Sequence, residues 1–281
     1  MHIRADLHVH TRASDGDLDP EQAVSQARFS GLDTVAVTDH DTVAGTQEAL
    51  DSAKKHGIEV IAGVEISAVF EPGTLHILGY FPSYPQGFEQ ALKPLQEARK
   101  LRFPRMVEKL NRLGIDISLE DVLKIAGNAQ VGRPHIAKAL INKGSVRDFD
   151  EAFSRYLAKG RPAYVEKEKM SPREAVRTIL AHNGIPVLAH PFTLDLEKPE
   201  FRRFIRELAD YGLMGIEISY PEHTRSQKRL FAQIAREHGL LITGGTDYHG
   251  PGQGGLTIGA YGLDKEALSV FRERLYQRSS S

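Results

Sequence analysis

Short apolar runs that end in His, Asp or Glu recur along this chain and constrain its fold more than any other feature. The first run is Asp6-Leu7-His8-Val9-His10. Alternate residues of a strand share one face, so Asp6, His8 and His10 place two imidazoles and a carboxylate together. One such pair is weak evidence for a metal site. The pattern repeats, however, at the ends of seven predicted strands, and it therefore constrains how those strands are arranged.

The predicted strands are mostly short apolar runs, and helical segments separate most of them. This alternation predicts an α/β fold with a parallel sheet. The length of 281 residues suits one α/β barrel with an insertion. We predict strands at residues 3–9, 34–38, 59–67, 75–81, 186–190, 215–219 and 241–244. We predict helices between them at residues 20–29, 43–56, 88–113, 172–183, 200–211, 225–238 and 265–277.

The alternation is interrupted between residues 99 and 164, where helical segments follow one another without a strand. We interpret this stretch as a helical insertion or cap. The predicted domains are therefore a barrel formed by residues 1–98 and 165–281, and an insertion domain formed by residues 99–164.

Composition excludes several classes of protein. The chain has no Cys, which rules out disulfides, thiolate catalysis and thiolate metal sites. Its net charge of -1 gives no overall attraction to DNA or to a membrane surface. The N-terminal residues lack the apolar core of a signal peptide, and no run approaches the roughly 20 apolar residues of a membrane span. We therefore expect a cytoplasmic protein with no DNA-specific site and no membrane contact.

The polar residues at the strand ends are candidate metal ligands. In a barrel the carboxyl ends of parallel strands meet at one rim, so residues far apart in sequence converge there. Imidazoles and carboxylates without thiolates suit Mn, Fe or Zn. The candidates outnumber the four ligands of a tetrahedral ion, which predicts two or three ions bridged by a carboxylate. They are His8, His10, Asp15, His40, Glu65, His76, His190, Glu217, Asp247 and His249.

Individual residues also allow simpler interpretations. His76 alternates with Leu75 and Ile77 and fits a hydrogen-bonded core histidine equally well. Glu65 lies between Val64 and Ile66. A buried carboxylate without a partner is costly, so Glu65 favours a cation site.

Basic residues in the insertion suggest an anion site. Gly132-Arg133-Pro134-His135 opens a predicted helix, whose first N–H groups attract anions. Arg133 adds a guanidinium that can bind a phosphate through two hydrogen bonds, and Arg161 lies in a second basic loop. Solvent-exposed surface explains each of these segments equally well. The basic residues between Lys93 and Arg112 suggest a solvated helix face or a contact to a nucleic-acid backbone.

These motifs resemble the polymerase-and-histidinol-phosphatase (PHP) family. The resemblance rests on Asp6 to His10 with Asp15, Thr38-Asp39-His40-Asp41, Gly63-Val64-Glu65, His76, Ala189-His190-Pro191 and Thr246-Asp247-Tyr248-His249. It implies a distorted seven-stranded (β/α) barrel that binds two or three divalent ions, with Mn favoured over Fe or Zn. It also implies the ligand sets: His8, His10, Glu65 and Asp247 for one ion; Glu65, His76 and His190 for a second; Asp15, His40 and His249 for a third.

Within the family, the chain is similar to the subgroup that hydrolyses nucleoside 3′,5′-bisphosphates and the 5′ ends of short RNA. The supporting features are Arg133 with His135, the run from Tyr156 to Pro162, and Ile218-Ser219 followed by His223. The implied reaction is attack on phosphorus by a metal-bridging hydroxide, with stabilisation of the spread phosphoryl charge. The implied catalytic residues are His8, His10, Glu65, Asp247 and His249, and the implied substrate contacts are Arg133, His135, Arg161 and His223.

Two other functions remain open at this point. One is a phosphatase for another small phosphomonoester, such as histidinol phosphate. The other is a non-catalytic PHP module that serves a polymerase or a scaffold, although such a module has no need to keep every ligand position filled.

Overall fold

The computed structural model describes residues 2–127, 131–166, 168–250 and 256–278. Its chain forms two compact units. The first comprises Met1–Leu92 with Lys169–Ser281, and the second comprises Lys93–Glu168. Residues 99–164, for which the sequence predicts a helical insertion, lie within the second unit.

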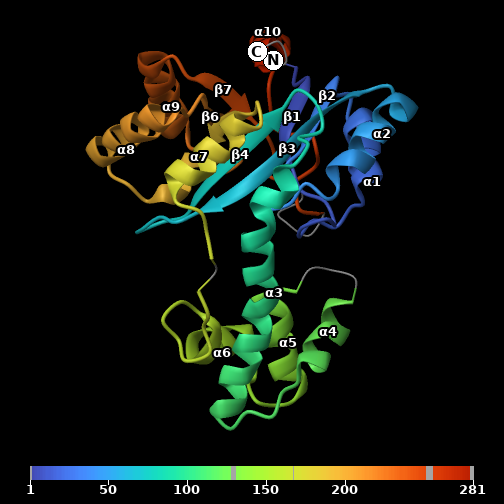
Figure 1. The fold of residues 1–281 in the computed structure, drawn as a ribbon, viewed down its shortest axis with the longest axis vertical. Coiled ribbons are helices and arrows are strands. Elements are labelled where there is room, and N and C mark those ends of the chain that lie inside the picture. Colours follow the sequence, from blue (N-terminus) through green and yellow to red (C-terminus); the bar gives the residue numbers. More distant parts are fainter. Residues whose placement is uncertain (1, 128–130, 167, 251–255, 279–281) are drawn as a thin grey trace. The chain divides into compact units, whose positions relative to one another are not determined.

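The first unit is an α/β barrel of seven strands (Figure 1). Its strands are β1 (Ala5–Val9), β2 (Thr34–Val37), β3 (Glu59–Ala68), β4 (Leu75–Phe81), β5 (Ile185–Leu188), β6 (Gly215–Ser219) and β7 (Leu241–Gly244). Its helices are α1 (Pro20–Phe29), α2 (Thr46–His56), α7 (Pro172–Ala181), the 3₁₀ turn η2 (Pro191–Leu194), α8 (Lys198–Tyr211), α9 (Arg225–His238) and α10 (Lys265–Gln277), while α3 (Phe88–Arg112) begins here and continues into the second unit.

The strands follow one another around the barrel in sequence order, but not all of them are parallel. β4 is antiparallel to both β3 and β5, so the prediction of a wholly parallel sheet is wrong at this strand. The reason is the short connection from β3 to β4, which contains no crossover helix, and a parallel neighbour requires one. Because β4 is reversed, its first residues rather than its last lie at the rim where the parallel strands end. His76 therefore reaches that rim from the start of its strand.

The barrel is nearly closed between its first and last strands. Val9 at the end of β1 pairs with Tyr248, just beyond β7, and the His10 amide donates to the Tyr248 carbonyl at 2.9 Å. At the opposite end, α10 packs Phe271 against Tyr80, with ring centroids 5.2 Å apart. This apolar layer seals the end of the barrel that is remote from the strand-end histidines.

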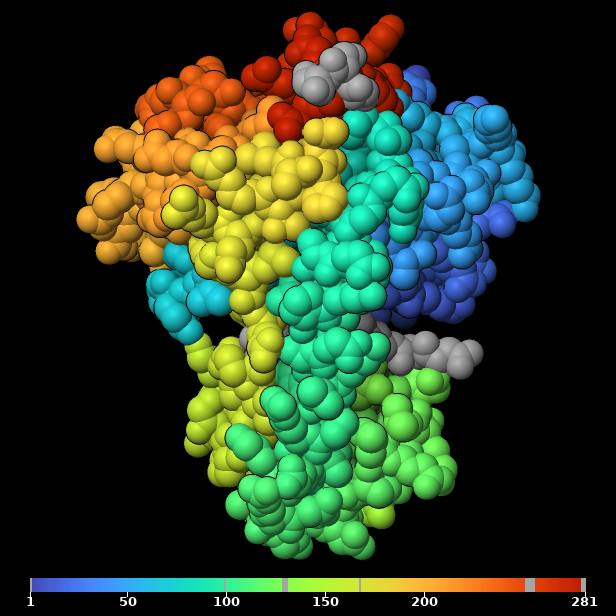
Figure 2. Space-filling model, viewed as in Figure 1, coloured from blue at the N-terminus to red at the C-terminus, as the bar shows by residue number. Residues whose placement is uncertain are grey.

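Helices cover the outside of the barrel. α1 and α2 lie side by side on the strands β1 to β3, and α7, α8 and α9 cover the strands β4 to β6 (Figure 1). In the space-filling view, the yellow and orange side chains of α7, α8 and α9 form a continuous layer on one side of this unit (Figure 2). The apolar faces of these helices bury the strands, so polar strand residues reach water only at the rims.

Local sequence signals explain where the helices begin and end. Ser171 caps α7 by accepting from the Glu174 amide, and the Glu174 carboxylate accepts from the Ser171 amide. Gly57 ends α2 with a φ of 62°. α2 begins at Thr46, three residues later than predicted, because the chain from Val43 to Gly45 forms a turn before the helix.

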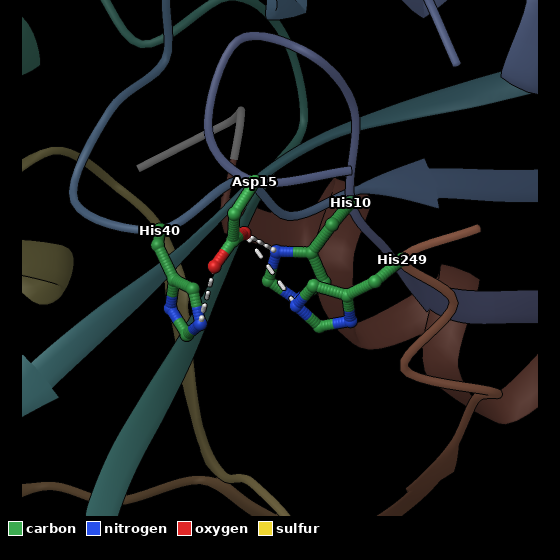
Figure 3. Close-up of side chains that lie close together, drawn as sticks. All are labelled: His10, Asp15, His40 and His249. Atoms are coloured by element: carbon green, nitrogen blue, oxygen red, sulfur yellow. Dashed lines mark ion pairs between the residues drawn. The ribbon is translucent and has the colours of Figure 1, made fainter. Parts of the chain in front are cut away.

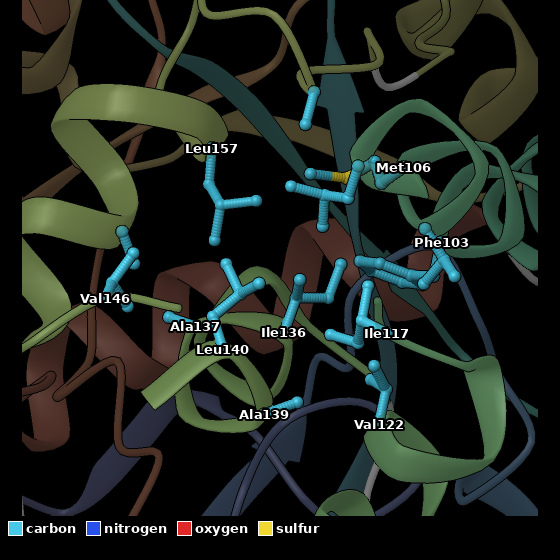
Figure 4. Packing of buried hydrophobic residues seen from close by; sticks show 14 residues of the cluster. Phe103, Met106, Ile117, Val122, Ile136, Ala137, Ala139, Leu140, Val146 and Leu157 are labelled. Carbon is cyan, nitrogen blue, oxygen red and sulfur yellow. The ribbon is translucent and has the colours of Figure 1, made fainter. Parts of the chain in front are cut away.

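The second unit is helical and has its own apolar core. It contains most of α3, then α4 (Leu119–Ala126), α5 (Arg133–Asn142), α6 (Phe149–Ala152) and the π-helical turn η1 (Phe153–Leu157). Met106, Ile136 and Leu140 are fully buried in this core (Figure 4). Leu110 belongs to the same cluster and is also fully buried. Within the described residues of both units, no helix combines the length and apolar character needed to cross a membrane.

Candidate metal centre

Glu65 is the centre of the polar cluster at the carboxyl-end rim. It lies on β3 and is fully buried. Its two carboxylate oxygens contact five imidazoles that lie at or just beyond the ends of four other strands, β1, β2, β4 and β5. Oε1 lies 2.8 Å from His76 Nδ1, 3.0 Å from His190 Nε2 and 3.5 Å from His8 Nε2, and Oε2 lies 2.9 Å from His40 Nδ1 and 3.2 Å from His10 Nε2.

The structure brings together at this rim the nine residues of the three ligand sets that the family resemblance implies. Three overlapping sets offer ligand atoms close enough to hold an ion. One set matches the first predicted group, and the third predicted group gains His10. In the second predicted group, His40 stands beside Glu65 and His76 in place of His190. The sets are His8, His10, Glu65 and Asp247; His10, Asp15, His40 and His249; and His40, Glu65 and His76.

The second of these sets lies at the more exposed edge of the cluster (Figure 3). Asp15 points its carboxylate between His40 and the stacked rings of His10 and His249. The distances from Asp15 are 3.6 Å to His10 Nδ1, 3.9 Å to His40 Nε2 and 3.5 Å to His249 Nε2. These spacings are too long for hydrogen bonds and leave room for an ion between the groups.

Several buried polar atoms in the cluster have no hydrogen-bond partner. Their chemical type shows whether the cluster suits cations. Buried polar groups are nearly always satisfied in proteins, so a concentration of exceptions requires an explanation. Divalent ions fit, because every unsatisfied atom is a nitrogen or carboxylate oxygen that metals prefer. These atoms are His8 Nε2, His10 Nδ1 and Nε2, His40 Nδ1, Glu65 Oε2 and Asp247 Oδ1.

The ligands are oriented by hydrogen bonds on their far sides. His249 Nδ1 donates to the Asp247 carbonyl at 2.8 Å, and His190 Nδ1 lies 3.1 Å from Thr193 Oγ1. In both rings Nε2 is left to point at the cluster. Tyr220 donates its hydroxyl to Asp247 Oδ2 at 3.0 Å, which turns Oδ1 toward the histidines.

Two further carboxylates shape the loops that carry ligands. Asp39 accepts from the Thr11 amide at 2.7 Å and from the Ser14 hydroxyl at 2.6 Å, and so holds the loop before Asp15. Asp41 accepts from the Ser67 amide at 2.9 Å. Both acidic residues adjoin His40 in sequence, and these hydrogen bonds tie them to loop and strand groups.

Backbone strain accompanies the ligands. Asp41, His190 and Asp247 have φ angles of 54°, 22° and 53°, which non-glycine residues rarely adopt. Such conformations cost free energy and persist where the surrounding structure enforces them, commonly at active sites. His190 follows β5, which ends at Leu188 rather than at the predicted residue 190, because this turn takes the chain out of the sheet.

The charges of the cluster shift its pKa values strongly. Burial alone would raise the pKa of Glu65, but neighbouring histidines, His40 foremost, hold that pKa well below its usual range. Burial opposes protonation of His10, yet Asp247 and Glu65 raise its pKa to about 10. Burial lowers the pKa of His76 to about 4. The buried carboxylates therefore stay anionic at neutral pH and bind whatever positive charge is available, protons or metal ions.

Two residues of this site have roles that the sequence did not predict. Glu217, a candidate metal ligand in the sequence, instead contacts His8 and His190 and lies outside the three ligand sets. Tyr220 was not predicted at all. The signal for Glu217 was present, since it lies in the apolar strand Gly-Ile-Glu-Ile-Ser as Glu65 lies in β3.

The predicted substrate contacts belong to different units. His223 lies in the first unit and is buried, with Nδ1 3.0 Å from the Ile218 carbonyl and its ring 5.0 Å from that of Tyr220. Arg133, His135 and Arg161 lie in the second unit.

Comparison with known proteins agrees with this architecture. The model of the PHP domain family matches residues 6–166. A 3′,5′-nucleoside bisphosphate phosphatase of Chromobacterium violaceum is 34% identical over 257 residues, which are 90% of each chain. A 5′-3′ exoribonuclease of Haemophilus influenzae is 36% identical, covering 89% of this chain and 92% of that protein.

A solved structure is also similar throughout. An amidohydrolase from Chromobacterium violaceum, with bound sulfate and no metal, superposes with a TM-score of 0.80 at 32% identity. The superposition covers 98% of this chain and 96% of that one. The match of the family model over more than half of the sequence, together with relatives aligned over nearly all of it, is decisive: the chain belongs to the PHP domain family.

Proposed function

We propose that this protein is a metal-dependent phosphoesterase that hydrolyses nucleoside 3′,5′-bisphosphates and the 5′ ends of short RNA. The observation that carries the proposal is the cluster of imidazoles and carboxylates around the buried Glu65. Two of the relatives that are similar over most of the chain are a 3′,5′-nucleoside bisphosphate phosphatase and a 5′-3′ exoribonuclease, which supports this substrate class.

The cluster would hold two or three divalent ions. Its imidazoles and carboxylates suit Mn, Fe or Zn, and among these the family resemblance favours Mn. When bound, such ions supply a nucleophilic hydroxide at neutral pH and neutralise charge on phosphoryl oxygens. Glu65 contributes both carboxylate oxygens and thereby joins the ligand sets. His8, His10 and Asp247 complete one set, and His249 contributes its free Nε2 to another.

His223 would contact substrate beside this cluster. Its Nδ1 donates to the Ile218 carbonyl, so in the neutral ring Nε2 is an acceptor, and this atom has no partner. Burial lowers the pKa of His223, which favours that neutral form. A neutral acceptor suits a substrate hydroxyl, such as one on ribose, better than a phosphate oxygen.

Arg133 would bind a substrate phosphate. Its guanidinium carbon lies 5.6 Å from the ring centroid of Phe153 and 5.8 Å from that of Tyr164, and Nη1 donates to the Leu157 carbonyl at 3.4 Å. These contacts orient the guanidinium and leave further N–H groups for an anion. His135 Nδ1 accepts from the Gly132 amide at 2.8 Å, which leaves Nε2–H as a donor. Arg161 lies in the loop after η1 and would add a further positive charge.

The test compares substrates that differ by one phosphate. Manganese-loaded protein should hydrolyse adenosine 3′,5′-bisphosphate with a kcat/KM that exceeds that for AMP by orders of magnitude. Arg133→Ala should raise KM for the bisphosphate and lower kcat, with metal content unchanged. Arg105→Ala, which removes an exposed arginine of α3, is the matched control and should have little effect.

Two results would contradict the proposal. Equal turnover of AMP, simple phosphate esters and the bisphosphate would leave a general phosphatase instead. An unchanged kcat/KM in Arg133→Ala would return Arg133 and the start of α5 to a structural role.

A further inference from the structure

Glu217 is a fully buried carboxylate outside the three ligand sets. It lies on β6, and its carboxylate contacts two residues. Oε1 lies 3.1 Å and Oε2 3.4 Å from His8 Nδ1, and Oε2 also accepts from the backbone amide of His190 at 2.8 Å. Both partners belong to residues that contact Glu65. One side chain therefore connects two ligands that the sequence separates by 182 positions, from residue 8 to residue 190.

The contact with His8 decides which nitrogen of that ring is available to a metal. A carboxylate only accepts, so His8 Nδ1 carries the hydrogen that bonds to Glu217. In the neutral ring the lone pair then lies on Nε2. That atom lies 3.3 Å from Asp247 Oδ1 and 3.5 Å from Glu65 Oε1, and it has no hydrogen-bond partner.

The contact with His190 fixes a backbone that is otherwise unfavourable. His190 has a φ of 22°, and its amide has left the β5 ladder. Glu217 accepts a hydrogen bond from this amide and so holds the turn. The turn places His190 Nε2 3.0 Å from Glu65 Oε1.

We propose that Glu217 is a positioning residue that sets the tautomer of His8 and holds the backbone of His190, and so orients two imidazoles of the metal centre at once. This inference rests on the metal centre of the proposed function, but not on its substrate.

A glutamine at position 217 separates this role from simple packing. Gln has nearly the same shape as Glu, but it presents one oxygen and one NH₂ group. The His190 amide can only donate, so it requires the oxygen. The NH₂ group then faces His8 Nδ1 and favours the opposite tautomer, with the hydrogen on Nε2, where the metal would bind. A residue that mattered only for packing would tolerate the exchange.

The experiment measures Mn²⁺ binding to the metal-free protein without substrate. In Glu217→Gln we expect one ion to bind about 10- to 100-fold more weakly, as is typical when the outer partner of a ligand is lost. Added to His8→Ala, the same change should cause no further loss at that position. Glu59→Gln is the matched control, because Glu59 is also a strand carboxylate but its partners are Thr34, Arg272 and Tyr276.

The outcomes separate this inference from the metal centre itself. If the unmodified protein binds no Mn²⁺, the metal centre is wrong. If it binds ions and Glu217→Gln binds them equally well, or loses affinity equally in the His8→Ala background, the positioning role is wrong.

A second measurement serves if Glu217→Gln fails to fold. Nitrogen-15 NMR of histidine-labelled, zinc-loaded protein reports the tautomer of each ring. The His8 ring should carry its hydrogen on Nδ1, and a hydrogen on Nε2 would overturn the proposal.

Discussion

At the scale of single residues, Glu65 carries more of the site than any other side chain. It lies between two apolar residues of β3, and its oxygens contact imidazoles from both halves of the barrel sequence, such as His40 and His190. We predict that Glu65→Gln loses two or more bound ions, because an amide has one ligand oxygen and its NH₂ group repels cations. His76→Ala removes one imidazole and should lose about one ion.

Elemental analysis after gel filtration of manganese-loaded protein measures this difference. Both variants are compared with the unmodified protein prepared in parallel. A larger loss of metal in His76→Ala than in Glu65→Gln would show that Glu65 does not bridge the ligand sets.

The pKa of His10 makes metal binding depend on pH. In the ion-free protein this pKa is raised to about 10, so His10 is protonated at pH 7. An ion that binds to His10 must displace that proton. We therefore predict that Mn²⁺ binding at pH 7 releases protons and strengthens as pH rises toward 10. Calorimetry in buffers of different ionisation enthalpy counts the protons, and His10→Asn should release fewer. A binding enthalpy independent of buffer would contradict this prediction.

The candidate ligands could be predicted from the sequence more easily than the residues that orient them. A carboxylate or imidazole in a buried apolar strand is costly unless it has a partner, so Glu65, His8 and His10 are conspicuous in the sequence. The hydrogen bond between His8 and Glu217 spans 209 positions. No local pattern predicts which buried acid orients which histidine, because that pairing depends on how distant strands approach.

At the scale of elements, hydrophobic patterns located the strands but not their directions. The range predicted for β4 is the range observed, yet β4 runs opposite to its neighbours. The alternation of buried side chains is the same for either direction of a strand. Only the absence of a helix between β3 and β4 indicated that β4 is antiparallel to β3. His76 nevertheless reaches the predicted rim, because in a reversed strand the second residue lies there.

The helical unit depends on an apolar core of its own, which gives a prediction about stability. Leu140 on α5 is fully buried among Met106, Leu110 and Ile136. Leu140→Ala should lower the free energy of unfolding of this unit by about 2–5 kcal/mol, from lost burial and the cavity left behind. Leu123→Ala on α4 is the control, since Leu123 is 47% exposed. Chemical denaturation gives both values, and equal effects of the two changes would contradict the packing described here.

At the scale of the whole molecule, the chain combines a barrel that carries every candidate ligand with a helical unit that carries Arg133 and the basic residues of α3. The interruption of strand–helix alternation was enough to predict an insertion. Its boundaries remain a prediction, because α3 extends through the position where the sequence suggested a border.

The basic residues of α3 lead to a prediction about long substrates. An RNA strand that contacts several cations releases counterions on binding, whereas a mononucleotide releases few. We therefore predict that kcat/KM for a 5′-phosphorylated oligonucleotide falls steeply as salt increases, while that for adenosine 3′,5′-bisphosphate falls much less. Parallel salt dependence for both substrates would mean that α3 presents only a solvated surface.

The measurement that tests the central claim most directly is a manganese titration of the metal-free protein, with bound metal and phosphate release from adenosine 3′,5′-bisphosphate recorded in the same samples. We predict no hydrolysis without metal, activity that rises as two to three equivalents bind, and reversible loss on chelation. Binding of less than one equivalent, or hydrolysis that continues in excess chelator, would contradict a metal-dependent phosphoesterase built on this cluster.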